Sequence, residues 1–208
     1  IDLYIIHWPD KYVPLETTMA ALEQAVRQGK VRYIGASNHN AAQLCEMLWL
    51  SDKHNWPKIV SSQIPFSLLR REFHHDLPFC QRHAIGVTPY QPLQGGLLAG
   101  KYKRGKMPPA DSRIAEKPDW VWPLDGPLFD RLEGIEALAT EAQAPPAQYA
   151  LAWTLMQTAM TSLVVGTKRI EQIQDAVAAV ELELTADHIE QLDAICPPPW
   201  QQPDPIRG

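Results

Sequence analysis

Short apolar runs recur along the first 90 residues of the chain and are separated by longer amphipathic segments. Residues 1–6 are apolar except for Asp2, and the run does not alternate strictly between apolar and polar positions. Such runs are typical of strands covered on both faces, as in a parallel sheet. This pattern predicts strands at residues 1–6, 31–35, 58–63, 85–90 and 162–166.

The segments between and after these runs have the spacing of helices. In the first of them, apolar residues recur at helical intervals from Leu15 to Val26, and Gly29 stands where a glycine commonly ends a helix. Asn40 and Thr185 precede two other segments as candidate caps. Helices are predicted at residues 14–30, 40–50, 72–84, 128–142, 146–157, 169–180 and 186–195.

The order of these elements indicates the fold class. The first four strands begin near residues 2, 31, 58 and 85, which are 27 to 29 residues apart. Strands that alternate with helices at this spacing predict βαβ units and a parallel sheet in an α/β fold. Residues 101–127 interrupt the rhythm with Lys, Arg, Pro and Gly and are predicted to form a long loop. Five strands fit either an incomplete (β/α)8 barrel or an open doubly wound sheet.

Composition excludes several classes of function. The chain of 208 residues is 45% hydrophobic and 21% charged, which is typical of a soluble globular protein. Its net charge of −5 gives no basic surface for nucleic acid or an anionic membrane. Three widely spaced cysteines indicate neither a disulfide framework nor a zinc site, so we expect a reduced, cytoplasmic compartment. The apolar runs are shorter than the ~20 residues that a membrane-spanning helix needs.

Polar and aromatic residues follow the carboxyl ends of the predicted strands, where parallel α/β folds place their active sites. Taken singly, each has an ordinary explanation: a histidine at a strand end is usually structural, Ser-Asn is a helix cap, and glycine pairs are turns. Together they provide groups that suit a ligand with an aromatic ring, a carboxamide and phosphates. The residues are His7-Trp8-Pro9-Asp10, Ser37-Asn38, Ser62-Gln63, Tyr90 to Gly96, and Lys168-Arg169.

Several of these motifs occur together in a known family. In order, they are IDLYIIHWPD, GKVRYIGASNHNAAQL, SSQIPFSLLRR, GVTPYQPLQGGLLAGKY and VVGTKRIEQIQDAV. From residue 1 to about residue 195 the chain resembles the later part of an aldo-keto reductase, from the fourth barrel strand onward. It is most similar to the bacterial general reductases related to the β subunits of voltage-gated potassium channels. The resemblance implies an incomplete (β/α)8 TIM barrel of about five βα units that binds NADP(H) without a Rossmann fingerprint.

The resemblance also implies roles for individual residues. His7, in the HWP motif, matches the family's catalytic histidine, and Trp8 is a candidate for the substrate pocket. Ser37, Asn38 and Gln63 match residues that hold the nicotinamide carboxamide. Tyr90 matches the aromatic residue that stacks on the nicotinamide ring. The pyrophosphate turn is matched by Gln91, Pro92, Leu93, Gly95, Lys101 and Arg113, and the adenosine end by Gly166, Lys168, Gln172 and Asp175.

The chain departs from the family's pattern at a few of these positions. Ala176 stands where an asparagine usually contacts adenine, and Gln91 and Gln94 replace smaller residues of the pyrophosphate turn. Lys168-Arg169 still favours a 2′-phosphate, so NADPH is preferred over NADH. The family's aspartate, general-acid tyrosine and lysine lie on earlier strands. We therefore expect residues 1–196 to be a barrel portion without its N-terminal strands, followed by a Pro-rich tail at 197–208.

The resemblance predicts an NADPH-dependent oxidoreductase that reduces aldehydes or ketones by direct hydride transfer. Without the tyrosine, the isolated chain is expected to be inactive. The alternative is a non-catalytic, cofactor-binding regulatory module like the channel β subunits. Metal-dependent hydrolysis has weaker support, because His7 and Asp10 lack a third ligand at a strand end. The expected partners are a small carbonyl substrate and another copy of the chain, with no nucleic acid, membrane or metal.

Overall fold

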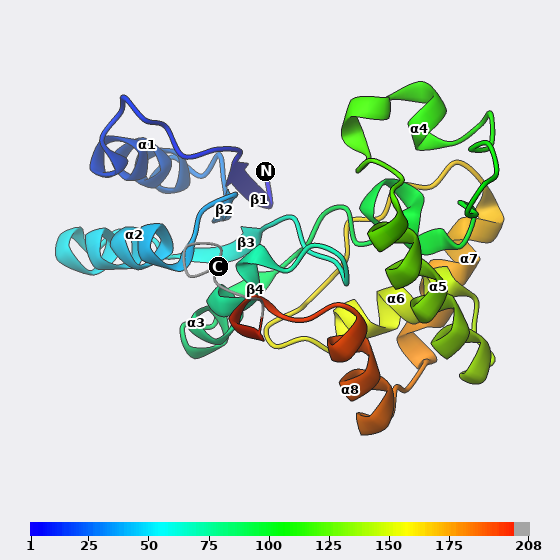
Figure 1. The fold of residues 1–208 in the computed structure, drawn as a ribbon. Helices are drawn as coiled ribbons and strands as arrows, with labels where there is room; N and C mark the ends of the chain where they lie inside the picture. Colours follow the sequence, from blue (N-terminus) through cyan, green and yellow to red (C-terminus); the bar gives the residue numbers. More distant parts are fainter. Residues whose placement is uncertain (202–208) are drawn as a thin grey trace, which may run out of the picture. The chain divides into compact units, whose positions relative to one another are not determined.

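The structure is a computed structural model that describes residues 1–201. Its chain forms two compact units, which Figure 1 shows as a ribbon. The first, here called the sheet unit, contains residues 1–65, 75–90 and 158–162. The second, the helical unit, contains residues 66–74, 91–157 and, within the described part, 163–201. Because each unit has its own core, the two are described separately.

The sheet unit is built on four parallel strands in the order β1-β2-β3-β4. They are β1 (Leu3–Ile6), β2 (Tyr33–Ser37), β3 (Ile59–Gln63) and β4 (Gly86–Val87). The register pairs Ile6 with Ala36 and Ser37 with Gln63, so the carboxyl ends of the first three strands lie together. The sequence predicted this parallel α/β arrangement, and the structure confirms it.

Three helices connect the strands and lie on one side of the sheet: α1 (Leu15–Arg27), α2 (Ala41–His54) and α3 (Leu77–Arg82) (Figure 1). Asn40 begins α2 through a capping box, because its side chain accepts a hydrogen bond from the Gln43 amide and the Gln43 side chain accepts one from the Asn40 amide, both at 3.0 Å. Gly29, just beyond α1, has a φ of 69°, which a glycine adopts without steric cost. Both predicted helix ends are thus confirmed.

The helical unit contains four longer helices and one short one: α4 (Arg113–Glu116), α5 (Gly126–Glu141), α6 (Pro146–Leu155), α7 (Ile170–Ala178) and α8 (Ala186–Ile195). Thr185 caps α8 by accepting a hydrogen bond from the His188 amide at 3.2 Å. Short 3-10 segments of the chain occur at Glu72–Asp76, Gln94–Ala99, Pro118–Trp120, Ala179–Glu181 and Pro199–Gln201. Gly95 and Gly96, which have positive φ values, interrupt the second of these. Within residues 1–201, no helix is long and apolar enough to cross a bilayer.

Some predicted elements were wrong. In residues 162–166 the structure has only an isolated bridge at Val164, and Val164 and Val165 remain 44% and 37% exposed. A run of valines forms a strand only where a neighbouring strand accepts its backbone hydrogen bonds, and a local pattern does not show that neighbour.

The strand predicted at 85–90 is reduced to Gly86–Val87. The helix predicted at 72–84 is a 3-10 turn followed by α3, and the loop at 101–127 contains α4. Of the Pro-rich tail, residues 202–208 lie outside the described part.

Arg71 links the segment before α3 to the helical core. Its side chain is only 4% exposed, and its Nη1 lies 2.7 Å from a carboxylate oxygen of Asp193 and donates to the carbonyl of Cys196. The guanidinium also lies 4.8 Å from the centre of the buried Trp153 ring. A buried cation costs desolvation free energy unless such partners compensate it. Arg71 therefore joins α6 to the end of α8.

Arg71→Ala is expected to lower the free energy of unfolding by about 2–3 kcal/mol, because Asp193 and the Cys196 carbonyl lose their buried partner. Arg70→Ala is the matched control. Arg70 lies 3.4 Å from Glu72 in a more exposed pair, so its loss should cost less than ~1 kcal/mol. Urea denaturation of both variants checks this, and equal losses would contradict the role assigned to Arg71.

Candidate functional site

Asn38 organises the carboxyl ends of the strands in the sheet unit. Its backbone has a φ of 62°, a left-handed conformation that asparagine tolerates better than most residues. From there its side-chain Nδ2 donates to the carbonyl of His7 at 2.8 Å and lies 3.0 Å from the Ser37 hydroxyl. The Asn38 amide donates to the Gln63 carbonyl at 3.0 Å. One residue thus ties together the ends of β1, β2 and β3.

Ser37 and His39 make the end of β2 rigid. The buried Ser37 hydroxyl donates to the Gln63 carbonyl at 2.8 Å. His39 is also buried, and its Nδ1 donates to the Ser37 carbonyl at 2.7 Å. Burial lowers the pKa of His39 below its usual value, so the neutral ring is favoured. His39 was missed as a site residue because a histidine in this position reads as an ordinary loop residue.

His7 and Trp8 lie at the exposed end of β1. Their ring centres are 5.6 Å apart, and Trp8 is 61% exposed. The His7 backbone is held through its carbonyl by Asn38, while its imidazole lies on an exposed residue. The backbone of His7 is therefore fixed by Asn38, while its exposed imidazole ring is accessible to a ligand.

Tyr90, which follows β4, contributes an aromatic ring to the same cluster. Its hydroxyl donates to the Asn38 side-chain oxygen at 2.8 Å, which orients the ring. The hydroxyl proton of Tyr90 is therefore engaged in the hydrogen bond to Asn38. Of the residues predicted from sequence, His7, Ser37, Asn38, Gln63 and Tyr90 are therefore connected in the sheet unit.

Tyr90→Phe keeps the ring and removes the bond to Asn38, so the free energy of unfolding is expected to fall by about 1 kcal/mol. Tyr33→Phe is the control: Tyr33 is 58% exposed, and its change should stay within about 0.5 kcal/mol. Denaturant midpoints measure both. A Tyr90→Phe protein as stable as the wild type would show that this bond does not hold the cluster.

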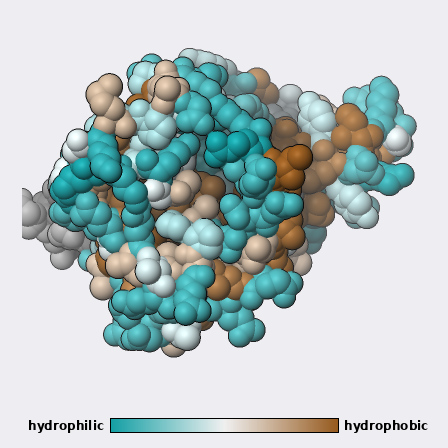
Figure 2. Space-filling model, turned by 90° about the vertical axis from the view of Figure 1, so that its right-hand side faces the viewer, coloured by the Kyte–Doolittle hydropathy of each residue, from teal (hydrophilic) through white to brown (hydrophobic). Residues whose placement is uncertain are grey.

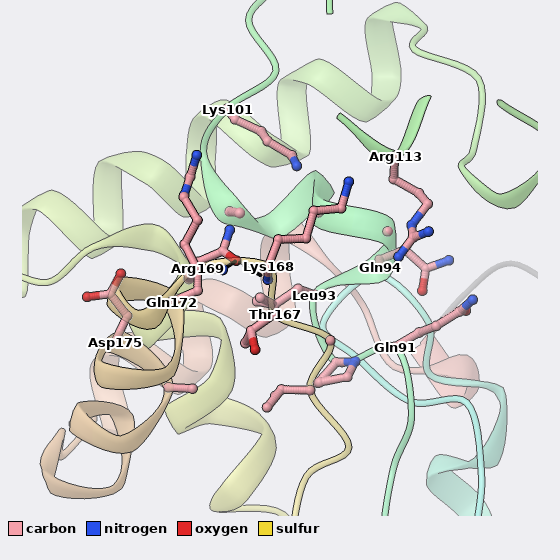
Figure 3. A pocket seen from close by; sticks show the side chains of 18 of the residues that line it. Gln91, Leu93, Gln94, Lys101, Arg113, Thr167, Lys168, Arg169, Gln172 and Asp175 are labelled. Atoms are coloured by element: carbon pink, nitrogen blue, oxygen red, sulfur yellow. Dashed lines mark hydrogen bonds between the residues drawn. The ribbon is translucent and has the colours of Figure 1, made fainter. Parts of the chain in front are cut away.

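The helical unit contains a cavity of about 610 Å³, within the size range of small-molecule sites. The turn after Tyr90, the loop at 101–127, α6, and the segment leading into α7 supply its walls. Figure 3 shows Lys101, Arg113 and Lys168 extending toward this space from three different segments. All ten residues predicted for the pyrophosphate and adenosine ends line it: Gln91, Pro92, Leu93, Gly95, Lys101, Arg113, Gly166, Lys168, Gln172 and Asp175.

One wall of the cavity is a turn with several residues in the left-handed region. Gln91, Gln94, Gly95 and Gly96 have φ values of 57°, 45°, 65° and 91°. A Cβ on Gly96 would lie 2.7 Å from the end of the Lys101 side chain and would displace it, and the φ of 91° itself favours glycine. For the two glutamines this conformation costs roughly 1 kcal/mol per residue, so contacts with the surrounding residues must stabilise the turn. Within residues 1–201, the buried side-chain oxygen of Gln94 lacks a hydrogen-bond partner.

Both positive and negative side chains line the cavity. The positive ones are Lys101, Arg113, Lys168 and Arg169, and the negative ones are Asp111, Glu116 and Asp175. Figure 2 shows that the side of the molecule on which α4 and α7 lie is mainly hydrophilic, with hydrophobic residues in smaller groups. The sequence did not predict Asp111 or Glu116 as site residues. The only signal was their position beside Arg113 in a charged loop.

The pKa of Lys101 is lowered from its usual value of 10.5. Partial burial is the main cause; Asp111 opposes the shift, and Lys168, Arg169 and Arg113 add to it. The neighbouring cations raise the free energy of the protonated Lys101. An anion that binds among these positive charges is therefore favoured. Cationic side chains and glycine amides at one cavity fit the phosphates of a dinucleotide.

Binding of inorganic pyrophosphate to the chain is expected to weaken as the pH rises toward 10.5. Lys101 is protonated only below its lowered pKa, so its contribution is present at lower pH and is lost as the pH passes through that value. Lys101→Met should remove this part of the pH dependence, whereas Lys106→Met, an exposed position in the same loop, should leave it. Isothermal titration calorimetry across pH measures the difference; identical profiles for all three proteins would contradict it.

Comparison with known proteins identifies the family. The model of the aldo/keto reductase family matches residues 1–197. The chain belongs to the aldo/keto reductase family. Within residues 1–201, no group of three metal-ligating side chains is placed to hold an ion. The family assignment and the parallel sheet confirm the resemblance and the predicted fold class, a portion of a (β/α)8 barrel.

Two relatives and one solved structure illustrate the similarity. A Schizosaccharomyces pombe protein provisionally named an aryl-alcohol dehydrogenase is 35% identical over 97% of this chain and 57% of its own length. Another protein of that yeast, provisionally named a voltage-gated potassium channel subunit beta, is 32% identical over 94% of this chain and 59% of its own. The crystal structure of the thermostable aldo-keto reductase Tm1743 with the inhibitor epalrestat matches with a TM-score of 0.70 and 27% identity. That match covers 94% of this chain and 60% of Tm1743.

Proposed function

We propose that this chain carries the cofactor-binding portion of an NADPH-dependent oxidoreductase that reduces aldehydes or ketones to alcohols. The observation that supports this most is the cavity in the helical unit, where four positive side chains and a glycine-rich turn surround a space of about 610 Å³. When bound, the nicotinamide cofactor supplies the hydride. Membership of the aldo/keto reductase family supports the reaction class.

In this proposal, the cavity binds the phosphates and the adenosine. The turn from Gln91 to Gly96 lies beside the pyrophosphate, and Lys101 neutralises its charge. The Gln94 and Gly96 amides donate to carbonyls within the turn, so Gly95 is its candidate amide donor. Lys168 and Arg169 stand before α7 and suit a 2′-phosphate, which favours NADPH over NADH. Gln172 is engaged locally, because its side-chain oxygen accepts from the Lys168 amide at 2.8 Å. This hydrogen bond holds the backbone at Lys168, whose side chain lines the cavity.

The cluster in the sheet unit is proposed to orient the reacting groups. Ser37, Asn38 and Gln63 have the amide and hydroxyl groups that recognise a carboxamide, and Tyr90 has a ring suited to stacking on nicotinamide. The exposed imidazole of His7 would hydrogen-bond the carbonyl oxygen of the substrate and position it. Trp8 beside it would contact the apolar part of the substrate.

The alkoxide formed on reduction needs a proton, and a positioned acid typically contributes ~10²–10⁴-fold to such a step. Two tyrosines near the predicted site are already engaged: Tyr90 donates to Asn38, and the buried Tyr102 hydroxyl lies 3.5 Å from the Gly95 carbonyl. We therefore propose that the 208 residues alone bind the cofactor but reduce aldehydes very slowly.

Titration of the 208-residue chain with NADPH tests this proposal. Trp120 lines the cavity, so binding should quench tryptophan fluorescence in a saturable manner. Turnover of an aromatic aldehyde by the same protein should stay close to the uncatalysed rate. Absence of saturable binding would contradict the cofactor site. Rapid turnover would show that the chain holds an acid other than those considered.

A second candidate function is a non-catalytic module that uses the cofactor as a regulatory ligand. The relative provisionally named as a potassium channel subunit supports this alternative. Both functions require the same cavity, so cofactor binding does not separate them. A longer natural protein that turns over aldehydes would favour the enzyme; tight binding without turnover in that protein would favour the module.

We propose a cytoplasmic location, which is supported by the free thiols of Cys45, Cys80 and Cys196 among the described residues. Burial raises the pKa of Cys80 and of Cys196 to about 11, so both are unreactive at neutral pH. Assembly into a homo-oligomer remains a prediction.

A further inference from the structure

The loop at 101–127 brings carboxylates to the positive side of the cavity. Glu116, at the end of the single-turn helix α4, hydrogen-bonds the Lys168 ammonium with one oxygen. Its other oxygen lies 3.7 Å from the Arg113 guanidinium. In the same loop, a carboxylate oxygen of Asp111 lies 3.5 Å from the Arg169 guanidinium. The cations that precede α7 are thus paired with groups of the protein itself.

These pairs make Glu116 and Asp111 competitors of a bound phosphate. A phosphate that binds Lys168 must either displace the carboxylate of Glu116 or remain close to it, and like charges at that distance repel. Hydrogen bonding to Lys168 is also the main reason that the pKa of Glu116 lies below its usual value, so the carboxylate is charged at neutral pH.

Glu116 is better placed than Asp175 to exchange with a ligand. Its side chain is 41% exposed and that of Lys168 is 54% exposed, so the pair separates into water at little cost. The helix that carries it has one turn, capped by the Ser112 hydroxyl, which accepts from the Ala115 amide at 3.4 Å. Asp175, on α7, instead accepts a hydrogen bond from the partly buried Gln148 side chain on α6 at 3.2 Å.

We propose that Glu116 is a specificity-determining residue that weakens binding of ligands with a 2′-phosphate by occupying Lys168. The carboxylate acts as an internal substitute for that phosphate. The discrimination between 2′-phosphorylated and unphosphorylated adenosine ligands is thereby set by the loop as well as by the basic residues before α7. This inference rests on the proposed function, because it assumes that the cavity binds the adenosine end of the cofactor.

Isothermal titration calorimetry with two fragments tests the proposal without any reaction. The probes are adenosine 2′,5′-bisphosphate and adenosine 5′-monophosphate, which differ by the 2′-phosphate, and the proteins are the wild type and Glu116→Gln at one ionic strength. Glu116→Gln should bind the bisphosphate about 2- to 5-fold more tightly, the range expected from releasing an exposed ion pair. Its affinity for the monophosphate should be unchanged.

Two further variants separate the local effect from net charge. Glu190→Gln removes the same charge from an exposed position on α8 and should change neither affinity. Glu116→Asp keeps the charge with a shorter side chain and should fall between the wild type and Glu116→Gln. Equal tightening by Glu190→Gln, or no tightening by Glu116→Gln, would overturn the role of Glu116.

The outcomes also distinguish this inference from the function on which it rests. If the wild type binds the bisphosphate and Glu116→Gln binds it no better, the inference fails and the cofactor cavity stands. If neither protein binds either fragment, the proposed function fails as well.

Discussion

The main physical constraint on the proposed site is the repulsion among the positive side chains that surround one cavity. Lys101, Arg113 and the adjacent pair Lys168-Arg169 reach it from three segments. The pKa of Lys101 is lowered mainly by partial burial, and the neighbouring cations lower it further. The loop at 101–127 reduces this repulsion by adding Asp111 and Glu116. A bound polyphosphate would balance the same charges. The loop and an anionic ligand are therefore alternative partners of one set of cations.

The sheet unit meets a different constraint, which is to hold polar groups at the strand ends without leaving them free to move. Asn38 does this through bonds to the first strand and to Tyr90, and through its backbone to Gln63. Because the protein supplies these partners before a ligand arrives, little conformational entropy remains to be lost on binding. Preorganisation of this kind suits groups that must align a substrate carbonyl with a reactive ring.

The regular part of the fold could be predicted because local signals agreed with each other. The period of the first strands, the cap at Asn40 and the glycine after α1 all pointed to the same βα units, and the structure contains them. The valines at 164–165 misled the prediction, because strand formation depends on a pairing partner that the local sequence does not contain. In the short β4, Gly86 and Val87 pair in register with β3. Beyond them the pairing is limited to single bonds, from the Thr88 amide to Ser62 and from the Tyr90 amide to Ile64.

The candidate site was predictable to the extent that its residues follow strands in sequence. Tyr90 to Gly96 follow β4, and Gly166 to Asp175 follow the apolar run at 162–166, although that run does not form a strand. The residues predicted from the second segment, Gly166, Lys168, Gln172 and Asp175, line the cavity. Asp111 and Glu116 lie in a loop without any period, so nothing in their spacing indicated which cations they would meet. Their role follows only from contacts between residues about 50 positions apart, such as Glu116 and Lys168.

The measurement that tests the central claim most directly is an amide NMR titration of the 208-residue chain with NADP⁺. If the cavity binds the phosphates, the backbone amide signals of Gly95, Gly96 and Gly166 should shift in a saturable manner, with further shifts at the start of α7. If these signals stay in place while NADP⁺ binds elsewhere or not at all, the assignment of the cavity to the cofactor is wrong.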